Sequence, residues 1–159
     1  MKQFLGLALL FWLAMAGGAR PAYSHCQVPC GIYDDPARIA QLHEDAATIE
    51  KAIQQITELA GKGDAQSANQ LARWVMTKEQ HATSIMTVVA EYFLAQRVKP
   101  VAAGAEGHAA YLQQLADHHG VMVAAMKAKQ NADLKFVEEL RVALAKLAAY
   151  YPPAESHHH

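Results

Sequence analysis

Apolar residues recur every three or four positions from about residue 35 onward. In the first stretch, which runs to about residue 60, they are Ile39, Leu42, Ala46, Ile49, Ile53, Ile56 and Ala60. This spacing places them on one face of an α-helix. Asp35 is a favourable N-cap and Pro36 suits the first helical turn. We therefore predict an amphipathic helix that starts here and ends at "GKGD".

The same pattern returns in three later stretches, at about residues 65–98, 107–130 and 133–151. Only Lys78 interrupts the apolar stripe of the second stretch, where the pattern allows it to snorkel or to lie at a subunit contact. "KPVAAGAEG" breaks the chain before the third stretch, and "YPP" ends the fourth. No alternating strand pattern occurs. We predict an all-α protein whose residues 34–151 form an antiparallel four-helix bundle.

The first 24 residues have the pattern of an export signal. Lys2 precedes the apolar run "FLGLALLFWLAMA", and "AYS" places small residues where a signal peptidase reads the chain. We predict cleavage between Ser24 and His25, with an uncleaved membrane anchor as the alternative. The mature protein is then periplasmic or extracellular and has no membrane segment.

Charge excludes nucleic acid as a partner. Removal of residues 1–24 takes away Lys2 and Arg20, which leaves 12 basic against 15 acidic side chains. The hydrophobic content of 52% is enough for a core without cross-links. We expect the last residues, 152–159, which end in "SHHH", to form a disordered tail.

Both cysteines of the chain lie in "HCQVPCGIYDD", directly after the predicted cleavage site. If His25 is the first residue, its free amine, the amide nitrogen and thiolate of Cys26, and the thiolate of Cys30 form a planar set of two nitrogens and two sulfurs. That set suits Ni(II) or Cu(II) and not tetrahedral zinc. The imidazole of His25 remains as a fifth, axial ligand. The alternative for two close thiols in an oxidising compartment is a disulfide.

Other residues of this segment stiffen it and direct it. Pro29 fixes one backbone dihedral between the two thiols, and Gly31 allows a sharp turn toward the first helix. Tyr33, three residues beyond Cys30, is placed so that its hydroxyl can reach an open axial position.

The segment "HCQVPCGIY" closely resembles the N-terminal hook H-C-x-x-P-C-G-x-Y of nickel superoxide dismutases. The resemblance implies one nickel per subunit, bound by the amine and imidazole of His25, the amide and thiolate of Cys26 and the thiolate of Cys30. It also implies that Tyr33 guards the substrate pocket and that the protein is a homohexamer. The implied activity is conversion of superoxide to O2 and H2O2 by Ni(II)/Ni(III) cycling at the hook, residues 25–33.

The sequence departs from the family's pattern at three places. Gln27 replaces an aspartate that is frequent in the hook, His81 in "KEQHA" stands where an arginine is expected, and Ala40 or Gln41 stands near an expected glutamate. An exported protein that carries nickel or copper without turnover remains the alternative function. A copper site of the histidine-brace type is less suitable, because it needs a second histidine and has no use for the thiols.

Histidines and methionines outside the hook are predicted to be structural. We expect the histidines to be surface residues or hydrogen-bonded core residues; they are His43, His81, His108, His118 and His119. The methionines at helical spacing are predicted to lie in the core; they are Met76, Met86, Met122 and Met126.

Overall fold

The computed structural model describes residues 33–152, and within them every regular element is helical. The predicted signal peptide, residues 25–32 of the hook and all but the first residue of the predicted tail lie outside the described residues. The elements are α2 (Asp35–Leu59), α3 (Ala65–Thr87), the π-helix η1 (Val88–Arg97), α4 (His108–Gln130) and α5 (Lys135–Ala148). The prediction of an all-α four-helix bundle is confirmed.

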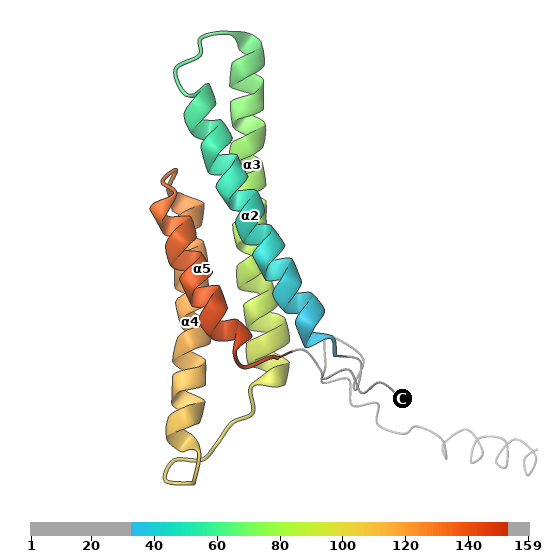
Figure 1. Cartoon of the computed structure of the whole chain (residues 1–159), viewed down its shortest axis with the longest axis vertical. Coiled ribbons are helices and arrows are strands. Elements are labelled where there is room, and N and C mark those ends of the chain that lie inside the picture. Colours follow the sequence, from blue (N-terminus) through green and yellow to red (C-terminus); the bar gives the residue numbers. More distant parts are fainter. Residues whose placement is uncertain (1–32, 153–159) are drawn as a thin grey trace, which may run out of the picture.

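Successive helices run in opposite directions and form two hairpins (Figure 1). The α2–α3 hairpin extends beyond the α4–α5 hairpin at the upper end of the view. At the opposite end, called the lower end from here on, the start of α2, the end of η1 and the end of α5 lie near one another, and α4 begins farther down, after a long loop (Figure 1). The candidate site is built at this lower end.

Acidic side chains start the first two helices. Asp34 caps α2 and accepts a hydrogen bond from the backbone N–H of Ala37 at 3.0 Å. Asp64 caps α3 in the same way, accepting from the N–H of Ser67 at 2.9 Å. The predicted N-cap of α2, Asp35, was therefore wrong by one residue. This shift leaves the Asp35 carboxylate available for other partners.

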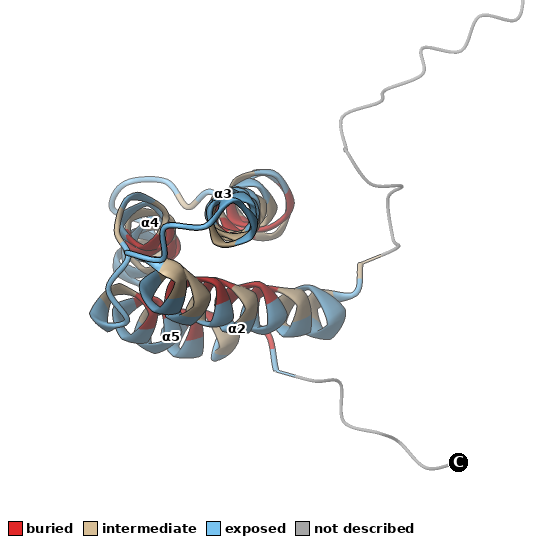
Figure 2. Ribbon diagram, turned by 90° about the horizontal axis from the view of Figure 1, so that it is seen from above, coloured by how far each residue is buried: buried red, intermediate tan, exposed pale blue. Residues whose placement is uncertain are grey.

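The predicted apolar stripes meet in one core. Buried residues line the faces on which the helices contact one another (Figure 2). The largest fully buried apolar side chains are Phe93, Leu42, Ile49, Ile53, Ile85, Leu140, Leu144, Leu147, Val89 and Val121. Within residues 33–152, none of the helices combines the length and the apolar character needed to cross a membrane.

The second predicted helix is not a single α-helix. After Thr87 the backbone changes to π-helical hydrogen bonding, which persists to Arg97. At its end the N–H of Val98 donates to the carbonyl of Phe93, five residues earlier, at 2.9 Å. The wider turn brings Tyr92 and Phe93 into the core as neighbours, which the regular α-helical spacing of the sequence did not predict.

Two methionines contradict the core prediction. Met76 is 59% exposed and Met126 is 41% exposed. Met86 and Met122 are partly buried and pack against the core, as predicted. Each exposed methionine lies on a helix whose opposite face is covered, so helical spacing alone did not identify the buried face.

Lys78 is buried in the bundle and does not snorkel. Its ammonium group donates to the carbonyl of Asn131 at 3.2 Å and to that of Ala128 at 3.4 Å, and also to the carbonyl of Lys129. These carbonyls belong to the last turn of α4 and its C-cap, and the end of a helix leaves such groups without intrahelical partners. The interruption in the apolar stripe is thus a cap that α3 provides for α4.

Candidate functional site

Of the four predicted site residues, the structure places Tyr33. His25, Cys26 and Cys30 lie outside the described residues. Tyr33 is the last residue of the predicted hook, so its surroundings show where the bundle meets that segment.

Tyr33 is half-buried and packs against the core at the lower end. The guanidinium carbon of Arg97 lies 4.5 Å from the centre of its ring, in a cation–π contact. The ring of Tyr92 meets it edge to face, with centroids 6.0 Å apart and an interplanar angle of 73°. Two residues of η1 therefore hold the end of the hook against the bundle.

Asp35 joins these two residues from the first turn of α2. Its carboxylate accepts from Arg97 Nη2 at 2.6 Å and from Arg97 Nε at 2.9 Å, and Tyr92 donates its hydroxyl to the same carboxylate at 2.7 Å. Hydrogen bonding to Asp35 raises the pKa of Arg97 above its ordinary value. Burial, followed by the Asp35 hydrogen bond, raises the pKa of Tyr92 to about 12. Tyr92 is therefore a neutral proton donor at physiological pH.

Sequence reasoning missed this cluster of Asp35, Tyr92 and Arg97. The partners of Asp35 are 57 and 62 residues away along the chain. No local motif signals such a contact. The one available signal is the tyrosine of "EYF" followed by an arginine at the end of the same helical stretch.

A second arginine adds positive charge beside the cluster. Arg38 is exposed, and its guanidinium carbon lies 5.5 Å from the centre of the Tyr92 ring. Arg38 Nη1 also donates to Gln41 Oε1 at 3.0 Å. Arg38 on α2 therefore covers the Tyr92 ring, and Arg97 on η1 covers the Tyr33 ring.

His81, at the position where the family pattern has an arginine, is part of another hydrogen-bonded group. Its Nδ1 lies 2.6 Å from Asp45 Oδ1, and the hydroxyl of Ser84 donates to Asp45 Oδ2 at 2.8 Å. Asp45 is buried on α2. Asp45 is therefore the acidic partner of His81.

His118 is a hydrogen-bonded core residue, as predicted. It is fully buried; its Nδ1 lies 2.7 Å from the carbonyl oxygen of Gln114, and its Nε2 lies 2.8 Å from the hydroxyl of Tyr151. A carbonyl oxygen can only accept, so Nδ1 carries the proton and Nε2 accepts from Tyr151. Burial lowers the pKa of His118. Its neighbour His119 is exposed.

The predicted metal ligands suit nickel by their chemistry. An amine, an anionic amide and two thiolates are strong donors that favour a planar metal and stabilise a higher oxidation state. Among residues 33–152 there is no group of three or more His, Cys, Asp or Glu side chains that could hold a metal ion.

Comparison with known proteins gives one match. Residues 20–155 match the family described as nickel-containing superoxide dismutase. Searches of curated proteins and of solved structures found no match. The matched range covers residue positions 25–33 and the whole helical bundle. The chain therefore belongs to the nickel-containing superoxide dismutase family, as an enzyme whose cofactor is nickel and whose substrate is superoxide.

Proposed function

We propose that one nickel ion per subunit is held by His25, Cys26 and Cys30 at the start of the mature chain. Bound there, nickel supplies a Ni(II)/Ni(III) couple, through which two superoxide ions and two protons become O2 and H2O2. The thiolates and the anionic amide would make the higher oxidation state accessible, and the imidazole of His25 would add a further donor. These ligands follow from the resemblance of the hook and from the donor chemistry.

The observation that carries the proposal is the position of Tyr33 against Arg97 and Tyr92. Cys30 is three residues away in sequence, so the length of an extended chain keeps it within about 11 Å of Tyr33. Tyr33 is thus fixed near the ligand segment by a cation–π contact and an aromatic contact. Its proposed role is to limit access to the metal and to hydrogen-bond superoxide or peroxide.

Charges near Tyr33 favour an anionic substrate. Arg38 lies over the ring of Tyr92 and Arg97 over the ring of Tyr33, and Asp35 offsets the charge of Arg97. A small positive surplus near an entrance raises the encounter rate of an anion, and the effect weakens as salt is added. We assign these arginines to substrate attraction as well as to holding Tyr33 and Tyr92.

Export and assembly complete the proposal. A signal peptidase cuts between Ser24 and His25, and the mature protein acts in the periplasm or outside the cell. The mature subunits assemble as a homohexamer, as the family resemblance implies. Both steps are supported by sequence alone.

The test is superoxide turnover by nickel-loaded protein that begins at His25, measured with metal content on the same sample. We expect turnover with one nickel per chain, and its loss in Cys26→Ser and in Cys30→Ser, since an oxygen donor cannot replace the thiolate. Val28→Ala is the matched control in the hook, because Val28 offers no side-chain ligand. Stoichiometric metal binding without turnover would instead support the carrier function.

A further inference from the structure

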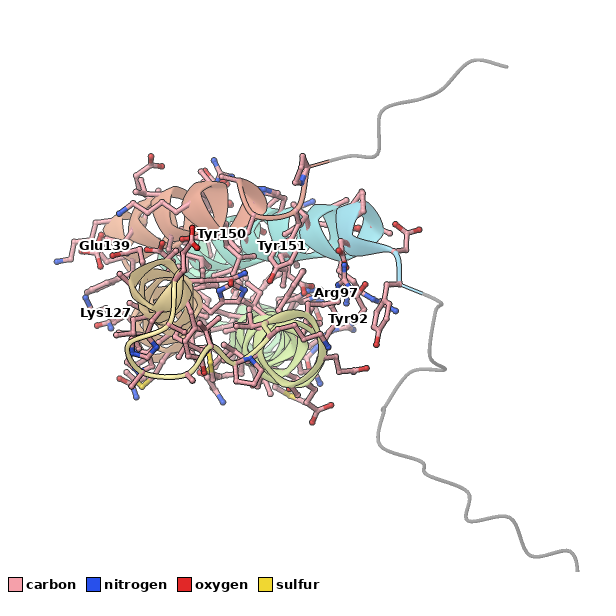
Figure 3. The ribbon with its side chains drawn as sticks, turned by 90° about the horizontal axis from the view of Figure 1, so that it is seen from below. Tyr92, Arg97, Lys127, Glu139, Tyr150 and Tyr151 are labelled. Carbon is pink, nitrogen blue, oxygen red and sulfur yellow. The ribbon has the colours of Figure 1, made fainter. Side chains whose placement is uncertain are left out.

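A row of aromatic rings leads from Tyr33 through the lower end to the surface. Ring centroids are 6.0 Å apart between Tyr33 and Tyr92, and 5.0 Å apart between Tyr92 and Phe93. They are 4.4 Å apart between Phe93 and Tyr151, and 6.4 Å apart between Tyr151 and Tyr150. Figure 3, which looks at this end, shows Tyr150, Tyr151 and Tyr92 in that order across the bundle.

The row passes from the interior to solvent. Tyr92 and Tyr151 are 6% and 8% exposed and Phe93 is fully buried, whereas Tyr150 is 37% exposed. Bulk solvent therefore reaches the end of the row at Tyr150 far more easily than its middle.

Each tyrosine of the row beyond Tyr33 is hydrogen-bonded to a base. Oxidation of a neutral phenol releases its proton, so a base at hydrogen-bond distance makes the oxidation easier. The three hydroxyl–base pairs are Tyr92 with Asp35 at 2.7 Å, Tyr151 with His118 Nε2 at 2.8 Å, and Tyr150 with Asp117 at 2.6 Å. Because Nδ1 of His118 carries its proton toward the carbonyl of Gln114, Nε2 is free to receive one from Tyr151.

Phe93 links two of these tyrosines without being oxidised itself. Its ring contacts both Tyr92 and Tyr151, and it has no hydroxyl that could release a proton. An electron therefore has to cross one phenyl ring between two oxidisable tyrosines. Tyr111 is not a member of this row; its ring packs beside that of His108, with centroids 6.1 Å apart.

We propose that Tyr33, Tyr92, Tyr151 and Tyr150 form a conduit that carries oxidising equivalents from the metal centre to the protein surface. The proposal rests on the proposed function, because hydrogen peroxide, the product of the reaction, is the oxidant. The conduit protects the hook, whose thiolates are the groups most easily damaged by peroxide.

The electrons balance as follows. One hydrogen peroxide takes two electrons and two protons at the hook and becomes two waters. Each electron moves from Tyr150 toward the hook. Tyr92, Tyr151 and Tyr150 each pass the phenolic proton to their own base when oxidised and recover it when reduced. Tyr33, which is half-buried, exchanges its proton with solvent. The oxidised residue at the end of the row is thus a Tyr150 radical, whose phenolic proton is bound by Asp117. A soluble one-electron reductant, such as a thiol, restores Tyr150, and solvent supplies the two protons consumed.

The experiment exposes nickel-loaded protein to hydrogen peroxide together with a nitroso spin trap, and maps the trapped tyrosines by mass spectrometry. We expect adducts at Tyr150 in the wild type and none in metal-free protein. In Tyr151→Phe two adjacent phenyl rings would separate Tyr92 from Tyr150. We expect labelling at Tyr150 to fall by at least about tenfold, since about 1.4 kcal/mol of added barrier already has that effect.

Two further variants control for folding and for surface oxidation. Tyr150→Phe removes the one well-exposed phenol of the row and should abolish the adduct at this end, with unchanged circular dichroism. Tyr111→Phe removes a tyrosine outside the row and should leave labelling at Tyr150 unchanged. In Tyr151→Phe, sulfinic or sulfonic acid should accumulate faster at Cys26 and Cys30 than in the wild type.

Equal labelling at Tyr150 in the wild type and in Tyr151→Phe would overturn the conduit. So would labelling of Tyr111 as strong as that of Tyr150, because it would show direct attack from solution. Superoxide turnover, measured on the same samples, separates the two proposals. Turnover without adducts at Tyr150 rejects the conduit alone, and adducts at Tyr150 without turnover reject the proposed dismutation alone.

Discussion

Arg97 holds Asp35 at two points, with Nη2 2.6 Å from one carboxylate oxygen and Nε 2.9 Å from the other. The pair joins the last turn of η1 to the first turn of α2 at the lower end. It fixes both the guanidinium that lies over the Tyr33 ring and the carboxylate that accepts from the Tyr92 hydroxyl.

Replacement of Arg97 by glutamine should destabilise the protein and lower turnover. The side chains of Arg97 and Asp35 are 31% and 15% exposed. The energy of this ion pair should therefore be intermediate between that of an exposed pair and that of a buried pair. We expect the free energy of unfolding to fall by about 1–2 kcal/mol, measured by urea denaturation. Arg141→Gln breaks the more exposed pair with Glu50 and should cost less than about 1 kcal/mol. Equal losses in the two variants would contradict the importance assigned to Arg97.

Lys78→Met should remove the cap of α4. The methionine keeps the apolar stem and leaves the carbonyls of Ala128, Lys129 and Asn131 without their donor. We expect a loss of about 1–3 kcal/mol in the free energy of unfolding. Lys62→Met, which affects an exposed pair with Glu58, is the control and should change it by less than about 0.5 kcal/mol. A Lys78→Met protein as stable as the wild type would show that the capping bonds contribute nothing.

Stability should decrease as the pH falls below 6.5 because of His118. Burial lowers the pKa of His118 from its ordinary value of 6.5, so the unfolded chain binds a proton at a pH where the folded chain does not. The contribution of the neutral imidazole is complete above 6.5 and is lost as the pH falls toward the lower folded-state pKa. Urea denaturation at a series of pH values measures this slope.

His118→Gln should flatten that slope. The variant removes the titrating group and also leaves the Tyr151 hydroxyl without its acceptor, at a cost of about 1–3 kcal/mol at neutral pH. The exposed neighbour His119 provides the control, since His119→Gln should keep the wild-type slope. The assignment to His118 fails if the slope is unchanged in His118→Gln.

Activity should require a free amine at His25. In a protein that begins at Ser24, the nitrogen of His25 is an amide and is a poor donor. We expect such a protein, loaded with nickel, to lose more than about a hundredfold in superoxide turnover, since even indirect changes at metal ligands cost 10–100-fold. The comparison with protein beginning at His25 needs equal protein concentration and measured metal content. Equal turnover would remove the amine from the ligand set.

Removal of nickel should leave the bundle helical. The buried core is made from side chains of α2, α3, η1, α4 and α5 together with Tyr151, and from the hook only Tyr33 packs against it. Burial of apolar surface contributes about 25 cal/mol per Å², and the core supplies far more of it than a nine-residue segment. Far-ultraviolet circular dichroism after chelation should match that of the loaded protein. A large loss of helical signal would mean that the metal holds the fold together.

The sequence predicted the four helices because each buries a stripe with regular spacing. Leu42, Ile49 and Ile53, for example, are all fully buried. The hook motif could also be recognised from local sequence, since its predicted ligands lie within six consecutive residues. The prediction that Met76 lies in the core was wrong, because spacing identifies a helix but does not decide which of its faces the neighbouring helices cover.

The partners of Asp35 could not be predicted, because they depend on how helices far apart in sequence come together. The row of rings from Tyr33 to Tyr150 has the same origin: its members come from the hook, from η1 and from the residues after α5. Local patterns predict single helices. Contacts between the ends of different helices require the assembled bundle.

The π-helical turn of Val88–Arg97 also sets a rotational phase. An α-helix advances by about 100° per residue, so deleting one residue from this segment would turn everything after it by about that angle. Arg97 would then face away from Asp35 while Val89 kept its place in the core. The loop that follows the helix could not restore the direction of the Arg97 side chain, because the loop begins after Arg97. One surplus residue within a single helix thus determines which side chain the start of α2 meets.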